Sequence, residues 1–104
     1  MLIEKKLLLT RQPNRACFIG NGLFCNLYEQ SAYIVCELLG VDLKLRVETI
    51  KKLNNEKLIV TGFPNAKVLG KFPEAIKTQW GYVLQDKFDL QGFSAWKSEL
   101  EARL

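Results

Sequence analysis

The 104-residue chain contains no histidine, which removes the commonest general base and a frequent metal ligand. Its three cysteines, Cys17, Cys25 and Cys36, form no Cys-x-x-Cys spacing, so zinc lacks its usual ligand set. No Gly-x-x-x-x-Gly-Lys-(Ser/Thr) loop for a nucleotide is present, and no serine or cysteine has a recognisable catalytic base. We therefore expect no enzymatic activity, no bound metal and no cofactor.

Long apolar runs are also missing, because no stretch approaches the roughly 18 residues that a membrane span requires. Residues 1–13 lack the apolar region and cleavage site of a signal peptide. The odd number of widely spaced cysteines suits reduced thiols, with Cys17 and Cys36 as core residues and Cys25 alone exposed. These absences favour a soluble, cytoplasmic protein without a membrane partner.

What the chain does contain is enough apolar material for one core. Hydrophobic residues make up 48% and charged residues 25% of the sequence, so a single domain can fold without disulfides or metals. Fifteen Lys and Arg residues against eleven Asp and Glu residues give a net charge of +4, which mildly favours an anionic partner. The sequence thus indicates a small basic protein.

The first half of the chain reads as helix, strand, helix and hairpin. Residues 1–11 fit either a helical stripe or an alternating strand, and the run at 15–19 predicts a buried strand. A helix is expected at 27–39, with Asn26 as its amino-terminal cap and Gly40 as its stop. Alternation at 41–47 predicts a half-exposed strand.

A hairpin with a basic tip is expected at residues 43–61. Its basic residues are Lys44, Arg46, Lys51, Lys52 and Lys57. Such lysines are often only a solvated strand edge that discourages pairing. Yet they are also what a weak DNA binder needs for phosphate contacts, so both interpretations remain open.

The second half begins with a turn at 62–65 and a partly helical stretch at 66–78. Gly70 and Pro73 should interrupt that helix, with Pro73 opening a second short helix. A last strand is expected near 82–84. The tail should form a helix capped by Ser94, with an apolar stripe at Trp96, Leu100 and Leu104. Docking of this helix on its own sheet is the default, and a surface for a protein partner or a second copy is the alternative.

Two glycine motifs in this order of elements point to a known family. Gly22-x-Phe24-x-Asn26-Leu-aromatic precedes the first long helix, and Gly62-x-Pro64 follows the hairpin. Over residues 13–88 this order resembles the amino-terminal mismatch-reading domain, domain I, of the MutS DNA mismatch repair family. The resemblance implies an α/β (α+β) fold with a mixed β-sheet flanked by helices, and a first helix ending near Pro13. It assigns residues 1–90 to that domain and 91–104 to a carboxy-terminal helix packed on it.

In that family the motif is Gly-Asp-Phe-Tyr-Glu-Leu-Phe, in which the phenylalanine wedges beside a mispaired base and the glutamate hydrogen-bonds it. The resemblance places Phe24 as the wedge and Asn26 at the glutamate position, while Leu23 and Cys25 replace the aspartate and the tyrosine. It implies a non-enzymatic DNA-binding module for mismatched or distorted duplex in DNA repair. Arg46, Lys51 and Lys52 are the candidate phosphate contacts.

Three alternatives accompany this hypothesis. Phe24 by itself suits a core position at a strand–helix junction, and Asn26 suits a helix cap. The replaced glutamate favours a protein–protein interaction or adaptor module that kept the fold but lost DNA reading, using the Trp96/Leu100 helix or the sheet edge. A thiol-based role at Cys25 ranks last.

Overall fold

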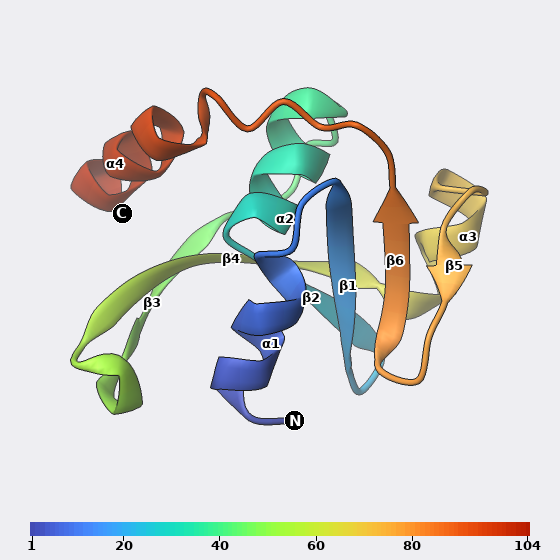
Figure 1. Cartoon of the computed structure of the whole chain (residues 1–104), viewed down its shortest axis with the longest axis horizontal. Helices are drawn as coiled ribbons and strands as arrows, with labels where there is room; N and C mark the ends of the chain where they lie inside the picture. Colours follow the sequence, from blue (N-terminus) through green and yellow to red (C-terminus); the bar gives the residue numbers. More distant parts are fainter.

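A six-stranded sheet organises the chain, with the strand order β3-β4-β2-β1-β6-β5 (Figure 1). The computed structural model describes all 104 residues. The strands are β1 (Arg15–Asn21), β2 (Phe24–Tyr28), β3 (Arg46–Ile50), β4 (Glu56–Pro64), β5 (Ile76–Lys77) and β6 (Gly81–Gln85). The α+β class is confirmed. Every pairing is antiparallel, however, so the sheet is not the expected mixture of parallel and antiparallel pairs.

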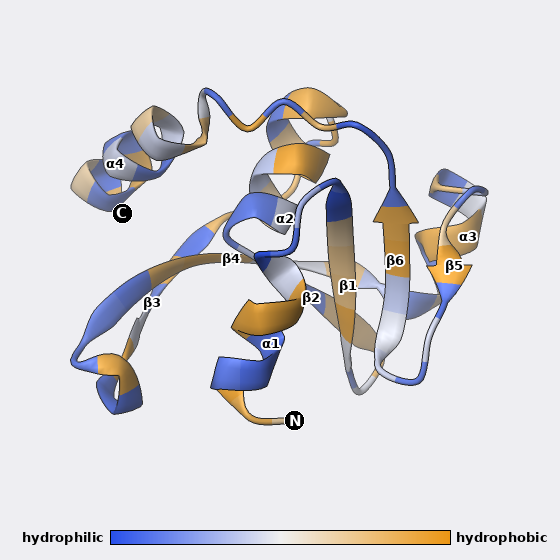
Figure 2. Ribbon diagram, in the orientation of Figure 1, coloured by the Kyte–Doolittle hydropathy of each residue, from blue (hydrophilic) through white to orange (hydrophobic).

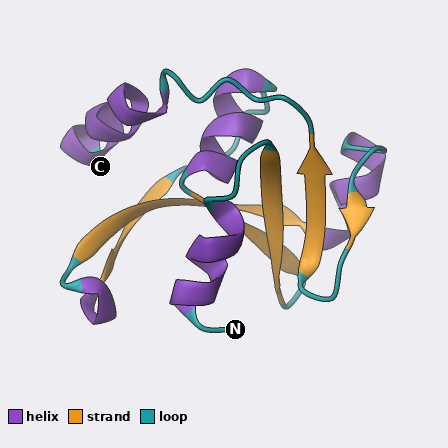
Figure 3. Ribbon diagram, viewed as in Figure 1, coloured by secondary structure: helices purple, strands orange, loops and turns teal.

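Short helices surround this sheet (Figure 3). The α-helices are α1 (Ile3–Thr10), α2 (Gln30–Tyr33), α3 (Val68–Lys71) and α4 (Phe93–Arg103). Helix α2 continues as the π-helical segment η1 (Ile34–Leu38), and two 3₁₀ turns, η2 (Lys51–Leu53) and η3 (Asn65–Lys67), follow β3 and β4. None of these helices has the length and apolar character that crossing a bilayer requires.

Alternation along the strands gives the sheet two apolar faces, because successive side chains of a strand point to opposite sides. The larger cluster holds fourteen buried residues, with Phe18 and Leu27 beneath α2, α3 and α4. The smaller holds seven, with Leu7 of α1 packed over Ile19 and Tyr28. Figure 2 shows that the outer end of β4, next to the β3–β4 turn, is hydrophilic, whereas the middle of this strand is apolar.

The tail helix α4 packs against α2 by its aromatic side chains. The rings of Trp96 and Tyr33 are 5.3 Å apart between centroids, and the Trp96 indole N–H donates to a Glu37 carboxylate oxygen at 2.9 Å. Lys97 forms an ion pair with Glu29, which is 3% exposed and also accepts a hydrogen bond from the Ile59 amide. Trp96 is therefore committed to contacts within the chain.

Several expected elements differ from those observed, in most cases because sheet pairing decides the backbone. Strand β3 begins only at Arg46, and Gly62–Pro64 continues β4 instead of turning, because these residues pair with Asn26–Phe24. No second helix starts at Pro73, since the chain next pairs Ile76 and Lys77 with β6. Helix α4 has Gly92 at its N-cap position, so Ser94 lies inside the helix and does not cap it.

Candidate nucleic-acid interface

The turn between β1 and β2 exposes two large apolar side chains. Asn21 pairs with Phe24, which leaves Gly22 and Leu23 as a two-residue turn. Gly22 has φ +65°, a conformation in which glycine is favoured and which suits a tight hairpin. Leu23 is 84% exposed and Phe24 is 53% exposed. We call these two residues the apolar tip.

Asn65 fastens the apolar tip to the neighbouring strand. Its side-chain amide donates to the Gly22 carbonyl at 2.7 Å, and its backbone N–H donates to the Leu23 carbonyl at 3.0 Å. The Cys25 thiol donates to the side-chain oxygen of Asn65. The sequence indicated Asn65 only as a turn residue, because nothing local shows that it reaches the first hairpin.

Phe24 and Asn26 lie two residues apart on one strand, so both point to the α1 face of the sheet. The Asn26 amide donates to the Tyr28 hydroxyl at 3.4 Å, and Lys6 of α1 lies 5.6 Å from the centroid of the same ring. The predicted cap at Asn26 is wrong, since α2 begins at Gln30 after Glu29. Residues 24–28 pair with β4, and 24–26 also pair with β1, so they form a strand instead.

Cys25 points the other way, into the larger cluster, and is buried. The prediction that it is the exposed cysteine is therefore wrong, and its side chain offers no surface to a ligand. Burial raises the pKa of Cys25 to about 11, so the thiol stays protonated at neutral pH. The hypothesis of a thiol-based role at Cys25 depended on an exposed thiol, and the structure removes that argument. Cys17 is buried as expected, whereas Cys36 is only partly buried.

The predicted phosphate contacts lie away from the apolar tip. Arg46 points to the same sheet face as Phe24, but it forms an ion pair with Glu48 at 3.1 Å. Lys51 and Lys52 are exposed at the far end of the β3–β4 hairpin (Figure 1). The nine residues of β4 separate the two turns, which corresponds to roughly 26 Å at about 3.3 Å per residue. Their role in DNA binding stays a prediction.

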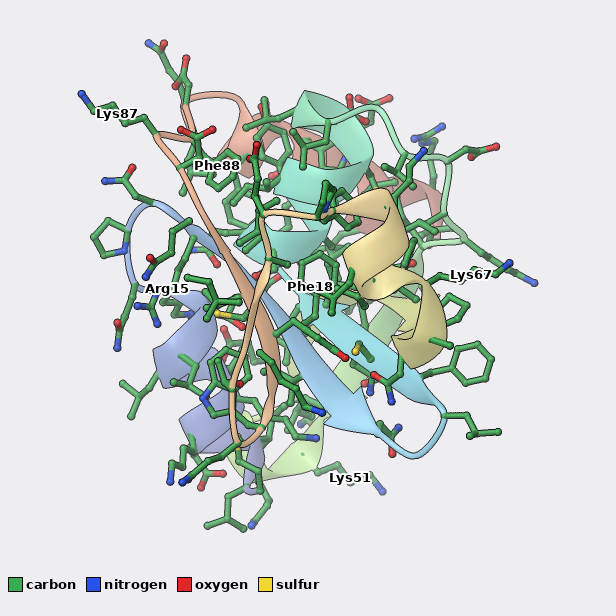
Figure 4. All side chains as sticks on the ribbon, turned by 90° about the vertical axis from the view of Figure 1, so that its right-hand side faces the viewer. Arg15, Phe18, Lys51, Lys67, Lys87 and Phe88 are labelled. Atoms are coloured by element: carbon green, nitrogen blue, oxygen red, sulfur yellow. The ribbon has the colours of Figure 1, made fainter.

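Four lysines that sequence reasoning did not single out lie nearer to the apolar tip. Lys67 and Lys71 line a hollow beside Phe63, the residue that pairs with Cys25. Lys6 and Lys77 line a separate groove on the other side. None of the four forms an ion pair with a carboxylate, and Figure 4 shows Lys67 extending away from the ribbon. Only the folded chain brings α1, α3 and β5 together here.

The groove beside the apolar tip has a volume of about 660 Å³ and lies between the β1–β2 turn and the β5–β6 turn. Figure 4 views this side of the molecule, with both turns at the same end of the sheet. Two groove-lining residues connect it to the hairpin that carries Phe24: Asn21 belongs to that hairpin, and Asn65 hydrogen-bonds to it. The lining contains lysines but no carboxylate, and the chain holds no group of three His, Cys, Asp or Glu side chains suited to a metal ion.

No family description, curated protein or solved structure among those compared with this chain gives a significant match. The resemblance to MutS domain I accordingly depends on the motif residues and the order of elements alone.

Proposed function

We propose that the chain is a non-enzymatic DNA-binding module that inserts Phe24 at mismatched or distorted duplex DNA. The observation that carries this proposal is the apolar tip, in which Leu23 and Phe24 are 84% and 53% exposed on a hairpin fixed by Asn65. Large exposed apolar side chains mark interaction sites when they are grouped. An aromatic ring on a fixed turn can enter a base stack without first being ordered.

Selectivity follows from the cost of opening the stack. Wedging an apolar side chain between base pairs costs a few kcal/mol per step, and this cost is lowest where pairing is already defective. Mismatches, bulges and junctions should therefore bind more tightly than regular duplex. Phe24 supplies the discrimination in this mechanism, and Leu23 widens the apolar contact.

Phosphate contacts would supply the remaining affinity. Lys67 and Lys71 lie on one side of the apolar tip and Lys6 and Lys77 on the other, all without carboxylate partners. The β3–β4 turn is roughly 26 Å away, which corresponds to roughly eight base pairs at about 3.4 Å each. One duplex can thus reach both turns, and affinity should fall as salt rises.

Asn26 is the candidate for contact with the base beside the wedge. Its amide group donates to Tyr28, which leaves the side-chain oxygen as an acceptor on the same face as Phe24. An amide brings no negative charge toward the phosphates, so binding is retained at this position while discrimination is weaker than with a carboxylate.

The first test compares a labelled matched duplex with the same duplex carrying one mismatch. We expect the wild type to favour the mismatched duplex, and Phe24→Ala to lose about 1–3 kcal/mol of that binding, the usual contribution of one base–aromatic contact. Leu8→Ala is the matched control, because Leu8 is 69% exposed on α1 but lies outside both the hairpin and the groove lining. The double variant Lys51→Ala/Lys52→Ala should weaken both duplexes equally.

A wild type that binds neither duplex, or a Phe24→Ala variant that binds both as well as the wild type does, would contradict the wedge. That result would favour the second candidate, a protein-binding module, which the same apolar tip also suits. Such a partner would not use Trp96, because that ring already packs on Tyr33 and its N–H on Glu37. The free edge of β3 is the other surface open to it.

A further inference from the structure

The groove beside the apolar tip has a lining with the chemistry of a nucleotide site. Two lysines, Lys6 and Lys77, supply positive charge at its rim without an ion-pair partner. Asn21 and Gln79 line the same groove, and both are exposed with side-chain amides that form no hydrogen bond within the chain. Amides of this kind both donate to and accept from base edges.

Trp80 adds an aromatic surface that the turn holds in place. Its backbone N–H donates to the Thr78 hydroxyl at 3.2 Å, and its carbonyl accepts from the Gly20 amide at 2.7 Å. Its side chain is partly exposed along the groove, and its indole N–H makes no hydrogen bond within the chain, unlike that of Trp96. Indole rings are good stacking partners for bases.

The volume and the position of the groove also suit a nucleotide. A groove of about 660 Å³ lies within the range of sites that take small ligands, and it can hold one nucleotide. Gly20 and Gly81 lie in its lining, where they contribute no side chain that would fill it. Asn21 belongs to the groove and pairs with Phe24, so a base displaced by the wedge would enter directly beside it.

We propose that this groove binds a single extrahelical nucleotide, with Trp80 stacking on the base, Asn21 and Gln79 contacting its edge, and Lys6 and Lys77 holding its phosphates. The inference rests on the proposed function and sharpens it. The preferred substrate becomes a duplex with one unpaired, displaced base, instead of distorted duplex in general.

The experiment uses two labelled duplexes that differ only at one bulged position. One carries an extra adenosine nucleotide, and the other carries an abasic residue that bends the duplex without offering a base. A matched duplex is the reference. The proteins are the wild type, Lys77→Ala, Gln79→Ala, Trp80→Leu, Phe24→Ala and the control Lys87→Ala. Lys87 is exposed beyond the opposite end of β6 (Figure 4).

We expect the wild type to bind the adenosine bulge at least about fivefold more tightly than the abasic bulge, as one stacked base provides. Lys77→Ala should weaken the adenosine complex, and Gln79→Ala and Trp80→Leu should bring the ratio toward one, while Lys87→Ala leaves it unchanged. Circular dichroism checks the fold of Trp80→Leu. Because Gln79 is exposed, Gln79→Ala should not disturb folding and therefore tests the groove independently.

Equal binding of the two bulges by the wild type would overturn the groove assignment, as would groove variants that behave like Lys87→Ala. If Phe24→Ala still removes the preference for bulged over matched duplex in that case, the proposed function stands without the groove. If the wild type shows no preference for either bulge over the matched duplex, the proposed function fails and the groove assignment falls with it.

Discussion

The two hairpin turns of this protein differ in chemistry and in what holds them. The β1–β2 turn carries Leu23 and Phe24 and is fastened by Asn65, which lies more than forty residues further along the chain. The β3–β4 turn, residues 51–55, carries Lys51 and Lys52 and is shaped by local backbone conformation. The difference separates selectivity, which needs a fixed apolar group, from general affinity, which exposed charge can supply.

Local conformation is evident in the β3–β4 turn. Asn54 and Asn55 have φ values of +56° and +61°, the left-handed region that asparagine tolerates better than most residues. Leu53 is partly buried against the smaller cluster, which anchors this turn from below. No side-chain hydrogen bond from a distant strand is involved, so the shape of this turn depends on its own backbone conformation and on the packing of Leu53.

Among substitutions at the two turns, replacing Asn65 should have the largest effect on stability and on DNA discrimination. We expect Asn65→Ala to lower the free energy of unfolding by about 1–2 kcal/mol, because the Gly22 carbonyl and the Cys25 thiol lose a partner. Discrimination between mismatched and matched duplex should fall too, although Asn65 need not touch DNA. Urea denaturation and the duplex titration measure the two effects.

Asn54→Gly is the counterpart at the other turn, because glycine adopts the left-handed conformation freely. It should change stability by only a few tenths of a kcal/mol and leave discrimination intact. Equal effects of Asn65→Ala and Asn54→Gly would show that the two turns are held in the same way.

Gly22→Ala should affect stability by no more than Asn65→Ala does, because it removes no hydrogen bond of the turn. An added methyl group meets nothing within 4 Å at this position, so the cost arises from φ +65° alone. That cost is roughly 1–2 kcal/mol for a non-glycine residue. Gly70→Ala on α3 is the control, since it also has open space but an ordinary φ, and it should be neutral or slightly stabilising. Thermal unfolding measures both variants. If their midpoints shift alike, the positive φ of Gly22 is not the cause of the cost.

The last prediction concerns pH and again separates the two turns. Burial raises the pKa of Cys25 from 9.0 to about 11, so the folded state retains the thiol proton that the unfolded chain has already released. This contribution to stability is complete below pH 9 and disappears as pH rises to about 11. Cys17 and Cys36 share the same direction.

Urea unfolding at pH 8, 9, 10 and 11 measures this dependence. Cys25→Ala should show a shallower decline than the wild type, whereas Lys51→Ala at the β3–β4 turn should decline as the wild type does. If the unfolding free energies of the wild type and Cys25→Ala decline in parallel with pH, the raised pKa of Cys25 is not the cause of the decline.

Patterns that depend on neighbouring residues predicted the structure well. The strand at 15–19, the basic hairpin and the strand near 82–84 are confirmed. The helix before Pro13 is also observed, although the local pattern fitted a strand equally well and only the family resemblance implied a helix. Asn26 was mistaken for a helix cap because its pairing partner, Gly62, lies 36 positions away and is invisible to a local rule. For the same reason, Gly62–Pro64 was predicted as a turn, although these residues form the end of β4.

The candidate site was predicted only in part. Motif order identified Leu23 and Phe24, and both are exposed. Cys25 was placed on the surface because an exposed loop was expected here, whereas the segment is a strand whose alternation points Cys25 into the core. The groove with Trp80 was not anticipated, since its lining comes from α1, the end of β1, Asn65 and the β5–β6 turn with the start of β6.

By itself the sequence determined a small basic α+β domain with an apolar group at one turn and lysines at another, because composition and periodicity act over a few residues. Only the tertiary structure decided that Asn65 holds the apolar tip, that Cys25 is buried behind it, and that Lys6 and Lys77 meet around Trp80. Hydrogen bonds and close packing between distant segments exist only once the sheet has assembled, and no local pattern encodes them.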